Sequence, residues 1–131
     1  CLVGRVAFTT HPRVDIEPLH YAFLDGWIYG RTSPGSKLDA VAHRHWVVFE
    51  VDEVASVFDW RSVVVHGAWF NWHDAPPAEH AAWERGLDAL RQLVPDALTL
   101  ADPVPFRTEV FRIHLDEVTG RECHPAPVPS Q

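Results

Sequence analysis

One loop of the sequence combines the groups that bind phosphate in proteins. Residues 28–41 read IYGRTSPGSKLDAV and contain Lys37, the only lysine among the eleven strong bases of the chain. A loop between the end of a strand and the start of a helix has free backbone N–H groups and lies at the positive end of the helix dipole. Hydroxyls and two cations add to these groups here. Together they predict a phosphate cradle built from Arg31, Thr32, Ser33, Ser36 and Lys37.

The same loop has a simpler interpretation as a solvated helix cap. Ser36 would then be the N-cap, Gly35 would allow the tight turn and Lys37 would lie on the surface. The local pattern fits both interpretations, and the scarcity of lysine elsewhere in the chain favours the phosphate site. A nucleotide-binding P-loop is not predicted, because Ser36 separates the second glycine of GRTSPGSK from the lysine.

Two other groups of residues have chemically capable side chains but lack the spacing of a site. His43 and His45 diverge by about 200° on the helix that we expect there, and no third ligand follows, so the histidines predict no metal site. Glu50, Asp52 and Glu53 are divided between the faces of an expected strand, so a charged strand face is predicted rather than a pair of catalytic carboxylates. No G-x-S-x-G signature of a serine hydrolase occurs.

Length, charge and cysteine content restrict the classes to which the protein can belong. A chain of 131 residues, 47% of them hydrophobic, predicts one domain with a real core. The formal charge of −7 argues against nucleic-acid binding, so an anionic ligand needs a local basic pocket. No apolar run is long enough for a membrane span. Cys1 and Cys123 are too few for a disulfide framework, and we expect two free thiols in a reducing cytoplasm.

The elements that must position the loop follow from periodicity and turn signals. Asp25-Gly26 suits a tight primed turn between two antiparallel strands, and Pro18 marks an edge or a bulge in the first of them. A bend is expected at Gly67. Strands are expected at residues 3–10, 16–23, 27–32, 46–54, 61–72 and 107–120, with a connection at 55–60, a short helix from near Ser36 and a longer helix within 74–95.

This order of elements predicts the fold class. About six strands follow one another in hairpin order, with one short inserted helix, one longer helix and no βαβ alternation. We therefore expect a mainly β protein, an antiparallel β-barrel with helical decoration. The barrel domain is expected to span residues 1–121, followed by a Pro-rich tail at 122–131. The longer helix carries one packing stripe, formed by Ala82, Trp83, Leu87, Leu90 and Val94.

Five stretches of the sequence occur together in an order that is specific to one family. They are GRVAF, IEPLHYAFLDGWIYGRTSPGSKLDAV, VVFEVDEV, WRSVVVHG and VFRIHLDEVTGR. In this combination the chain resembles the pyridoxamine 5'-phosphate oxidase-like, FMN-binding split-barrel proteins, and within them the flavin-nucleotide-binding or nitroimidazole-resistance-like branch. The resemblance covers residues 3–121 except the helical stretch around Trp83. It implies a split antiparallel β-barrel and a homodimer with two FMN sites at the subunit interface.

The resemblance also implies which residues hold the cofactor. The residues of the phosphate cradle would hold the phosphate and ribityl end of FMN. Leu19, His20 and Tyr21, on the partner strand of the hairpin, would run along the flavin ring. Trp60, Arg61 and Ser62, at the start of WRSVVVHG, would contact the ring or the phosphate. The oxidases have a glutamine where this chain has Ser62, and their C-terminal substrate-binding residues have no counterpart here. Oxidation of pyridoxamine phosphate is therefore not expected.

Two functions from different classes follow from the resemblance. The first is a flavin enzyme that passes electrons from a reduced donor, such as a nicotinamide, to a small-molecule acceptor. The second is a module that binds flavin or haem without turnover. A haem variant exists among split-barrel proteins, and His20, His66 or His114 would then be the axial ligand. Deazaflavin is a further alternative to FMN, because a related branch uses it.

Overall fold

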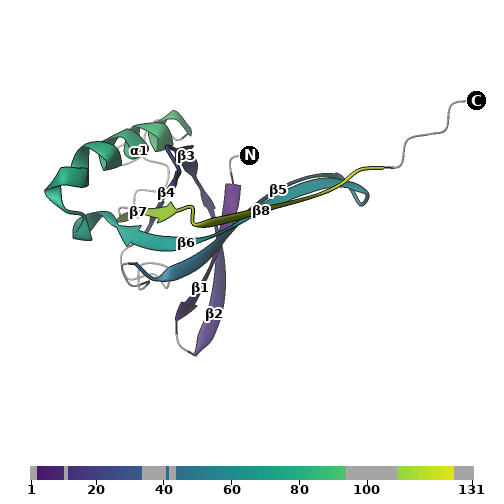
Figure 1. The fold of residues 1–131 in the computed structure, drawn as a ribbon, viewed down its shortest axis with the longest axis horizontal. Coiled ribbons are helices and arrows are strands. Elements are labelled where there is room, and N and C mark those ends of the chain that lie inside the picture. Colours follow the sequence, from purple (N-terminus) through teal and green to yellow (C-terminus); the bar gives the residue numbers. More distant parts are fainter. Residues whose placement is uncertain (1–2, 11, 34–40, 42–43, 94–108, 126–131) are drawn as a thin grey trace, which may run out of the picture.

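The computed structural model describes residues 3–10, 12–33, 41, 44–93 and 109–125. Strands make up most of this part of the chain, and one α-helix and two 3-10 turns complete it (Figure 1). In chain order the elements are β1 (Val3–Thr10), β2 (Arg13–His20), β3 (Ala22–Leu24), β4 (Trp27–Thr32), β5 (Trp46–Ser56), β6 (Asp59–Asn71), η1 (Trp72–Asp74), η2 (Pro77–Glu79), α1 (His80–Leu93), β7 (Glu109–His114) and β8 (Glu117–Cys123).

The strands form one antiparallel sheet that does not close on itself. Their order is β2-β1-β5-β6-β7-β4-β3, and β8 pairs with β6 beside this path. Strands β2 and β3 are the two ends, and within the described ranges no ladder joins them. In the described residues the fold is therefore a mainly β split barrel with one α-helix as decoration, which confirms the predicted fold class, although this part of the chain has eight strands and not the expected number of about six. None of the described helices is long and apolar enough to cross a bilayer.

The Asp25-Gly26 turn has the geometry that the sequence predicts. Asp25 has a φ of 52° and Gly26 a φ of 82°, which suits a type I′ turn between β3 and β4. The strand before this turn is interrupted at Tyr21, however, and only β3 pairs with β4. The preceding strand, β2, pairs with β1, because a short turn brings the two directly together. The partner predicted for residues 16–20 was therefore wrong, whereas Pro18 does lie in an edge strand.

The last predicted strand, residues 107–120, is two strands in the structure. β7 ends at His114 and β8 begins at Glu117. β7 pairs with residues 69–71 of β6, and β8 pairs with residues 60–66 of the same strand. Between these segments lies Gly67, the position of the expected bend, where an added Cβ would be 1.8 Å from the carbonyl oxygen of His114. The single-strand prediction failed because the β-type residue pattern continues across the break.

Residues 55–60 form the end of a long hairpin and not a simple connection. β5 continues to Ser56, Val57 and Phe58 form the turn, and β6 begins at Asp59. With β8 paired to β6, this hairpin projects well away from the body of the protein (Figure 1). We call residues 53–63, together with β8, the arm.

The inside of the barrel is filled by apolar side chains. Trp69 is fully buried, its ring stacks on Phe111 with the centroids 3.9 Å apart, and its Nε1 donates a hydrogen bond to Oδ1 of Asn71 at 2.8 Å. The buried indole therefore keeps a polar partner. The members of this cluster are Val6, Phe8, Leu19, Ile28, Val41, Val47, Phe49, Val65, Trp69, Phe111 and Ile113.

Helix α1 packs on the outside of β3, β4 and β7. Three residues of the predicted stripe, Trp83, Leu87 and Leu90, are buried there, whereas Val94 lies outside the described residues. The helix sits close to β4, because a Cβ added at Gly86 would lie 2.1 Å from the ring of Tyr29. The two prolines predicted for the first turn of the helix precede it, and Pro77 opens the 3-10 turn η2.

Arg112 is a buried cation beneath this helix. Its side chain is 3% exposed, and its Nη2 donates to Oε1 of Glu79 at 2.7 Å. Its Nη1 donates to the hydroxyl oxygen of Tyr29 at 3.2 Å. The guanidinium carbon lies 3.7 Å from the ring centroid of Trp27 and 4.6 Å from that of Trp83. The ion pair and the cation–π contacts together offset the cost of burying the charge.

We expect Gly67→Ala to destabilise the fold. The new Cβ would meet backbone at 1.8 Å, and overpacking of this kind costs about 1–3 kcal/mol or more of unfolding free energy. The matched control is Gly120→Ala in the paired strand β8, where the nearest atom would be 3.9 Å away. Urea unfolding of both variants measures the difference, and equal midpoints would contradict the close approach at Gly67.

We expect Glu79→Gln to lower the unfolding free energy by about 1–3 kcal/mol, because it leaves the buried Arg112 without its anionic partner. Glu84→Gln, on an exposed position of α1, is the control and is expected to change stability by less than about 0.5 kcal/mol. Thermal unfolding checks both. A Glu79→Gln variant as stable as the control would show that the hydrogen bond to Tyr29 and the cation–π contacts support the arginine without a charged partner.

Candidate functional site

The predicted phosphate cradle starts at the end of β4. Arg31 and Thr32 are 7% and 6% exposed, and Ser33, the next residue, is half-buried. As neighbours in a strand, Arg31 and Thr32 point to opposite faces, Arg31 to the side of Tyr29 and α1, Thr32 to the barrel side. Ser36 and Lys37 lie outside the described residues, as does most of the short helix expected there. The cradle as a whole remains a prediction.

The three residues predicted to run along a flavin ring have different environments. Leu19 is 4% exposed and its side chain belongs to the barrel core, whereas His20 is exposed at the end of β2. Tyr21 is half-buried in the break between β2 and β3, and its ring meets that of Phe49 edge-on at a centroid distance of 5.0 Å. Tyr21 lines hollows on the described part of the surface.

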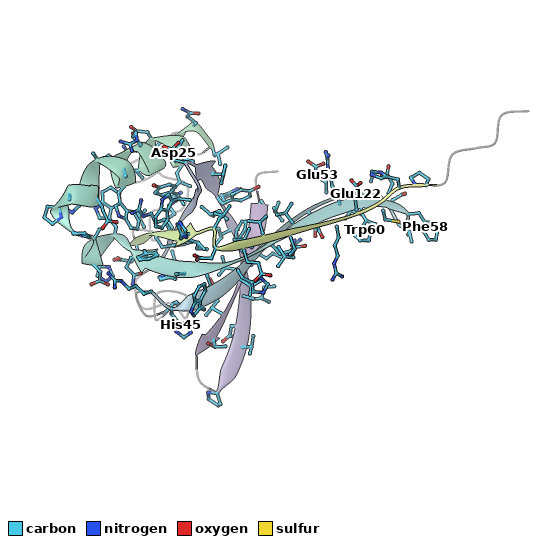
Figure 2. The ribbon with its side chains drawn as sticks, in the orientation of Figure 1. Asp25, His45, Glu53, Phe58, Trp60 and Glu122 are labelled. Atoms are coloured by element: carbon cyan, nitrogen blue, oxygen red, sulfur yellow. The ribbon has the colours of Figure 1, made fainter. Side chains whose placement is uncertain are left out.

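Two adjoining hollows on the arm bring four of the predicted residues together. We call the smaller one, of about 150 Å³, the Tyr21 hollow; it is lined by Tyr21, Val51, Asp52, Glu53, Arg61, Ser62 and Val63. We call the larger one, of about 440 Å³, the arm hollow; it is lined by Glu53, Val54, Ala55, Asp59, Trp60, Arg61 and His124. Figure 2 shows Glu53 and Trp60 on the arm, well away from Asp25 and the helix. Tyr21 and Trp60, which are 39 positions apart in the sequence, thus line adjoining hollows that share Glu53 and Arg61. We call the surface formed by these two hollows the arm surface.

Arg61 and Glu53 border both hollows. They are paired across β5 and β6, and Nε of Arg61 donates to Oε2 of Glu53 at 2.7 Å. Their side chains are 69% and 52% exposed, so the ion pair is solvated and contributes little to stability. An arginine in such a weak pair can exchange its carboxylate partner for another anion at small cost.

An apolar wall borders the Tyr21 hollow, and the sequence analysis did not assign it to the site. A further hollow of about 220 Å³ continues from Tyr21 and is lined by Tyr21, Phe23, Ile28, Phe49, Val51, Val63, Val65, Leu115 and Val118. Phe23 and Val118 are 60% and 53% exposed. The wall was missed because β8 was not separated from β7 and its partner was therefore unknown. The available signal was the run of three valines in VVVHG, of which Val63 is 37% exposed and Val65 is buried.

Burial raises the pKa of Tyr21 above its usual range, and the negative charge of Glu53 raises it further. The phenol therefore stays protonated throughout the neutral range and can donate a hydrogen bond. This gives the Tyr21 hollow an aromatic face with a polar edge, next to an apolar wall and an exposed arginine.

Two carboxylates do share one face of β5, which the sequence analysis did not recognise as a pair. Nη1 of Arg5 lies 3.0 Å from Oε1 of Glu50 and 3.4 Å from Oδ2 of Asp52. Burial raises the pKa of Glu50, Asp52 raises it further, and Arg5 opposes the shift. The cluster lies on the outer face of the sheet, and the arginine that joins it comes from β1, which the spacing along β5 does not reveal.

The histidines considered as haem ligands are separated in the structure. His20 and His66 are exposed, and His114 has its Nδ1 3.1 Å from Oδ1 of Asp116 and its ring against Trp27. Among the residues that the structure describes, no group of three or more metal-binding side chains occurs.

The protein is a split barrel with hollows between the arm and the break that separates β2 from β3. The chain belongs to the pyridoxamine 5'-phosphate oxidase family, whose model matches residues 2–122. None of the curated proteins matches the chain.

Several solved structures are similar over most of the chain. An FAD-binding protein from Mesorhizobium loti is 26% identical, with 95% of this chain and 87% of that chain covered and a TM-score of 0.71. A Corynebacterium glutamicum protein, provisionally named a pyridoxamine 5'-phosphate oxidase, is 30% identical, with 96% and 84% covered and a TM-score of 0.64. An FAD- and haem-binding protein from Mycobacterium smegmatis shares the fold at 15% identity, with 98% and 69% covered and a TM-score of 0.63.

We expect Glu53→Gln to lower the pKa of Tyr21. The substitution removes the negative charge that raises this pKa, while the larger contribution from burial remains, so the pKa stays above its usual range. Tyrosinate absorbance measures it, since Tyr29 is the only other tyrosine and is 2% exposed. Glu84→Gln on α1 is the control. Identical titration curves for Glu53→Gln and the control would contradict the electrostatic coupling.

Proposed function

We propose that the protein binds FMN on the arm surface and uses it to pass electrons from a reduced donor to a small-molecule acceptor. The observation that carries this proposal is the convergence of Tyr21, Trp60, Arg61 and Ser62 on two adjoining hollows beside an apolar wall. A flavin needs such a combination, because its ring is flat and largely apolar while its phosphate needs cations. The FAD-binding relatives support flavin as the class of cofactor.

In this proposal the chain's own residues divide the work. Tyr21 and the apolar wall hold one face of the ring and exclude water from it, and the protonated phenol of Tyr21 donates a hydrogen bond to a ring acceptor. Arg61 exchanges Glu53 for an anionic part of the cofactor. The loop at residues 31–37 holds the phosphate. FMN supplies the redox chemistry itself, and the protein supplies binding, orientation and electrostatics.

In this proposal FMN is preferred over FAD and deazaflavin. The predicted cradle is a loop with one lysine, which suits a single terminal phosphate group. Two relatives are named as FAD-binding proteins, so FAD is the competing ligand to test. Parallel titrations with FMN, FAD and a deazaflavin nucleotide distinguish the three. If FAD bound more tightly than FMN, FAD would be the proposed cofactor in place of FMN.

The proposal includes a homodimer. Both hollows are open to solvent on one side in the single chain, so a bound ring would keep one face in water. A second copy that covers this side would exclude the water. Trp46, which is 63% exposed, offers the aromatic surface that is favoured at interfaces, whereas Trp69 and Trp83 are buried in the fold and cannot contribute. Light scattering at micromolar concentration tests this part, and a monomer mass would contradict it.

The second candidate is a binding module without turnover. The observation that supports it is the similarity to the FAD- and haem-binding protein from Mycobacterium smegmatis. An absorbance spectrum of the purified protein separates the candidates. A yellow protein that bleaches with a reduced nicotinamide and regains its colour with an acceptor supports the flavin enzyme. A flavin spectrum that no donor bleaches, or a Soret band, supports the module.

We expect Lys37→Ala to weaken FMN binding by roughly tenfold or more, because it removes a charge-assisted hydrogen bond of about 1.5–3 kcal/mol. Lys37→Arg should recover part of the loss, since the charge returns in a different geometry. Arg85→Ala, at an exposed position of α1, is the control for a change of net charge. Fluorescence quenching of FMN by the apo-protein measures the affinities.

The helix-cap interpretation of the same loop predicts a different outcome. Lys37→Ala would then be nearly neutral, and Ser36→Ala would lower the unfolding free energy by about 1 kcal/mol. Equal FMN affinities of the wild type and Lys37→Ala would show that the lysine does not bind the phosphate.

A further inference from the structure

A hollow whose lining carries no charge adjoins the arm surface. We call it the wall hollow; it measures about 220 Å³ and is lined by Tyr21, Phe23, Ile28, Phe49, Val51, Val63, Val65, Leu115 and Val118. The phenol of Tyr21 is the one polar side-chain group in this lining. The Tyr21 hollow, by contrast, has Asp52, Glu53 and Arg61 in its lining. The two hollows therefore share Tyr21 but suit ligands of different polarity.

The floor of the wall hollow is part of the barrel core, and its rim is exposed. Phe49, Val65 and Val118 lie opposite one another on β5, β6 and β8, so their side chains share one face of the sheet. Phe49 and Val65 are 1% and 3% exposed, whereas Val118 is 53% exposed. From β3 comes Phe23, which is 60% exposed. The shape of the floor is thus fixed by the fold before a ligand enters.

These properties specify the chemical class of a ligand. An ionised group placed against this lining would lose hydration without gaining a counter-charge, whereas apolar surface gains free energy when it is buried there. The volume lies below the range of roughly 300–1,000 Å³ that holds drug-sized ligands, so the ligand is small. The protonated phenol of Tyr21 can donate a hydrogen bond to a carbonyl oxygen. An uncharged ring compound with a carbonyl group satisfies all three conditions.

We propose that the wall hollow binds the electron acceptor of the proposed reaction, and that this acceptor is an uncharged quinone. The inference rests on the proposed function, because it requires a reduced flavin on the arm surface. A quinone becomes a hydroquinone by taking up two electrons and two protons, and the reduced flavin loses the same number as it returns to its oxidised form. Because Tyr21 lines both hollows, the two ligands would contact the same side chain.

The lining also separates the acceptor from the donor. A nicotinamide dinucleotide carries phosphate groups, and the wall hollow offers no cation to pair with them. The donor is therefore expected to bind elsewhere. A second copy of the chain is the competing occupant of this hollow, since exposed apolar surface also serves in protein interfaces.

Calorimetric titration of the full chain without flavin tests the binding step. The probe is a naphthoquinone methylated at both free positions of its quinone ring, which prevents addition of cysteine thiols. We expect saturable binding, and Phe23→Ala should raise the dissociation constant by roughly fivefold or more, because an aromatic contact is lost. Phe58→Ala is the matched control, since Phe58 is 69% exposed at the far end of the arm (Figure 2). Absence of saturable binding, or an equal loss in the control, overturns the proposal.

A change of charge at the rim tests the assigned ligand class. Val118→Lys should weaken binding of the neutral quinone by roughly tenfold and strengthen binding of the same ring bearing a carboxylate. Val57→Lys makes the same change of net charge in the turn of the arm, where Val57 is 78% exposed, and should alter neither affinity. If the wild type binds the carboxylate analogue as tightly as the neutral quinone, the assigned class is wrong.

Reoxidation of the reduced, flavin-loaded protein tests the role as acceptor. Phe23→Ala should raise the half-saturating quinone concentration by the same factor as the dissociation constant, whereas Phe58→Ala should leave it unchanged. Sedimentation of both variants detects the competing occupant: a loss of dimer in Phe23→Ala with unchanged quinone binding overturns the proposal. FMN titration is read separately. A wild type that binds quinone but not FMN contradicts the proposed function, and one that binds FMN but not quinone contradicts this inference.

Discussion

Strand β6 changes partners at Gly67, and the two halves of the protein are held together by that change. Its first half pairs with β8 to make the arm, and its second half pairs with β7 to close one side of the barrel. The carbonyl of His114 occupies the space where a side chain at residue 67 would begin. Because only glycine leaves that space, the carbonyl can approach, and β7 and β8 can follow one another along a single strand.

The filled barrel interior determines where a ligand can lie. Trp69 and Phe111 stack inside it, and Phe49 and Phe8 fill the remainder, as side chains do in small barrels. The hollows that described residues line lie along the arm, beside Tyr21 and next to Trp46. A cofactor held on the arm is covered on one face only. This is the physical reason that the proposed function depends on the β5–β6 hairpin.

Two arginines of the protein differ in burial and therefore in what their charge can do: the buried one stabilises the fold, and the exposed one can bind a ligand. Arg112 is enclosed by Glu79, Tyr29 and two indole rings, so its charge is used in fixing α1 on the sheet. Arg61 lies in a solvated pair with Glu53 and borders two hollows. In a chain with a formal charge of −7, an exposed cation in a hollow is the kind of group that attracts an anionic ligand locally.

The sequence by itself determined the fold class, the type I′ turn at Asp25-Gly26, the edge position of Pro18 and the buried stripe of α1, because each depends on local periodicity or on the φ preference of one or two residues. It also indicated the family and four of the residues that line the arm surface, Tyr21, Trp60, Arg61 and Ser62. The tertiary structure decided that Leu19 lies in the core, that residues 107–120 form two strands, and that Phe23 and Val118 extend the wall beside Tyr21. It also decided that Arg5 joins Glu50 and Asp52. These features depend on which strands pair, and pairing between distant segments is set by packing of the whole sheet rather than by the residues of either segment.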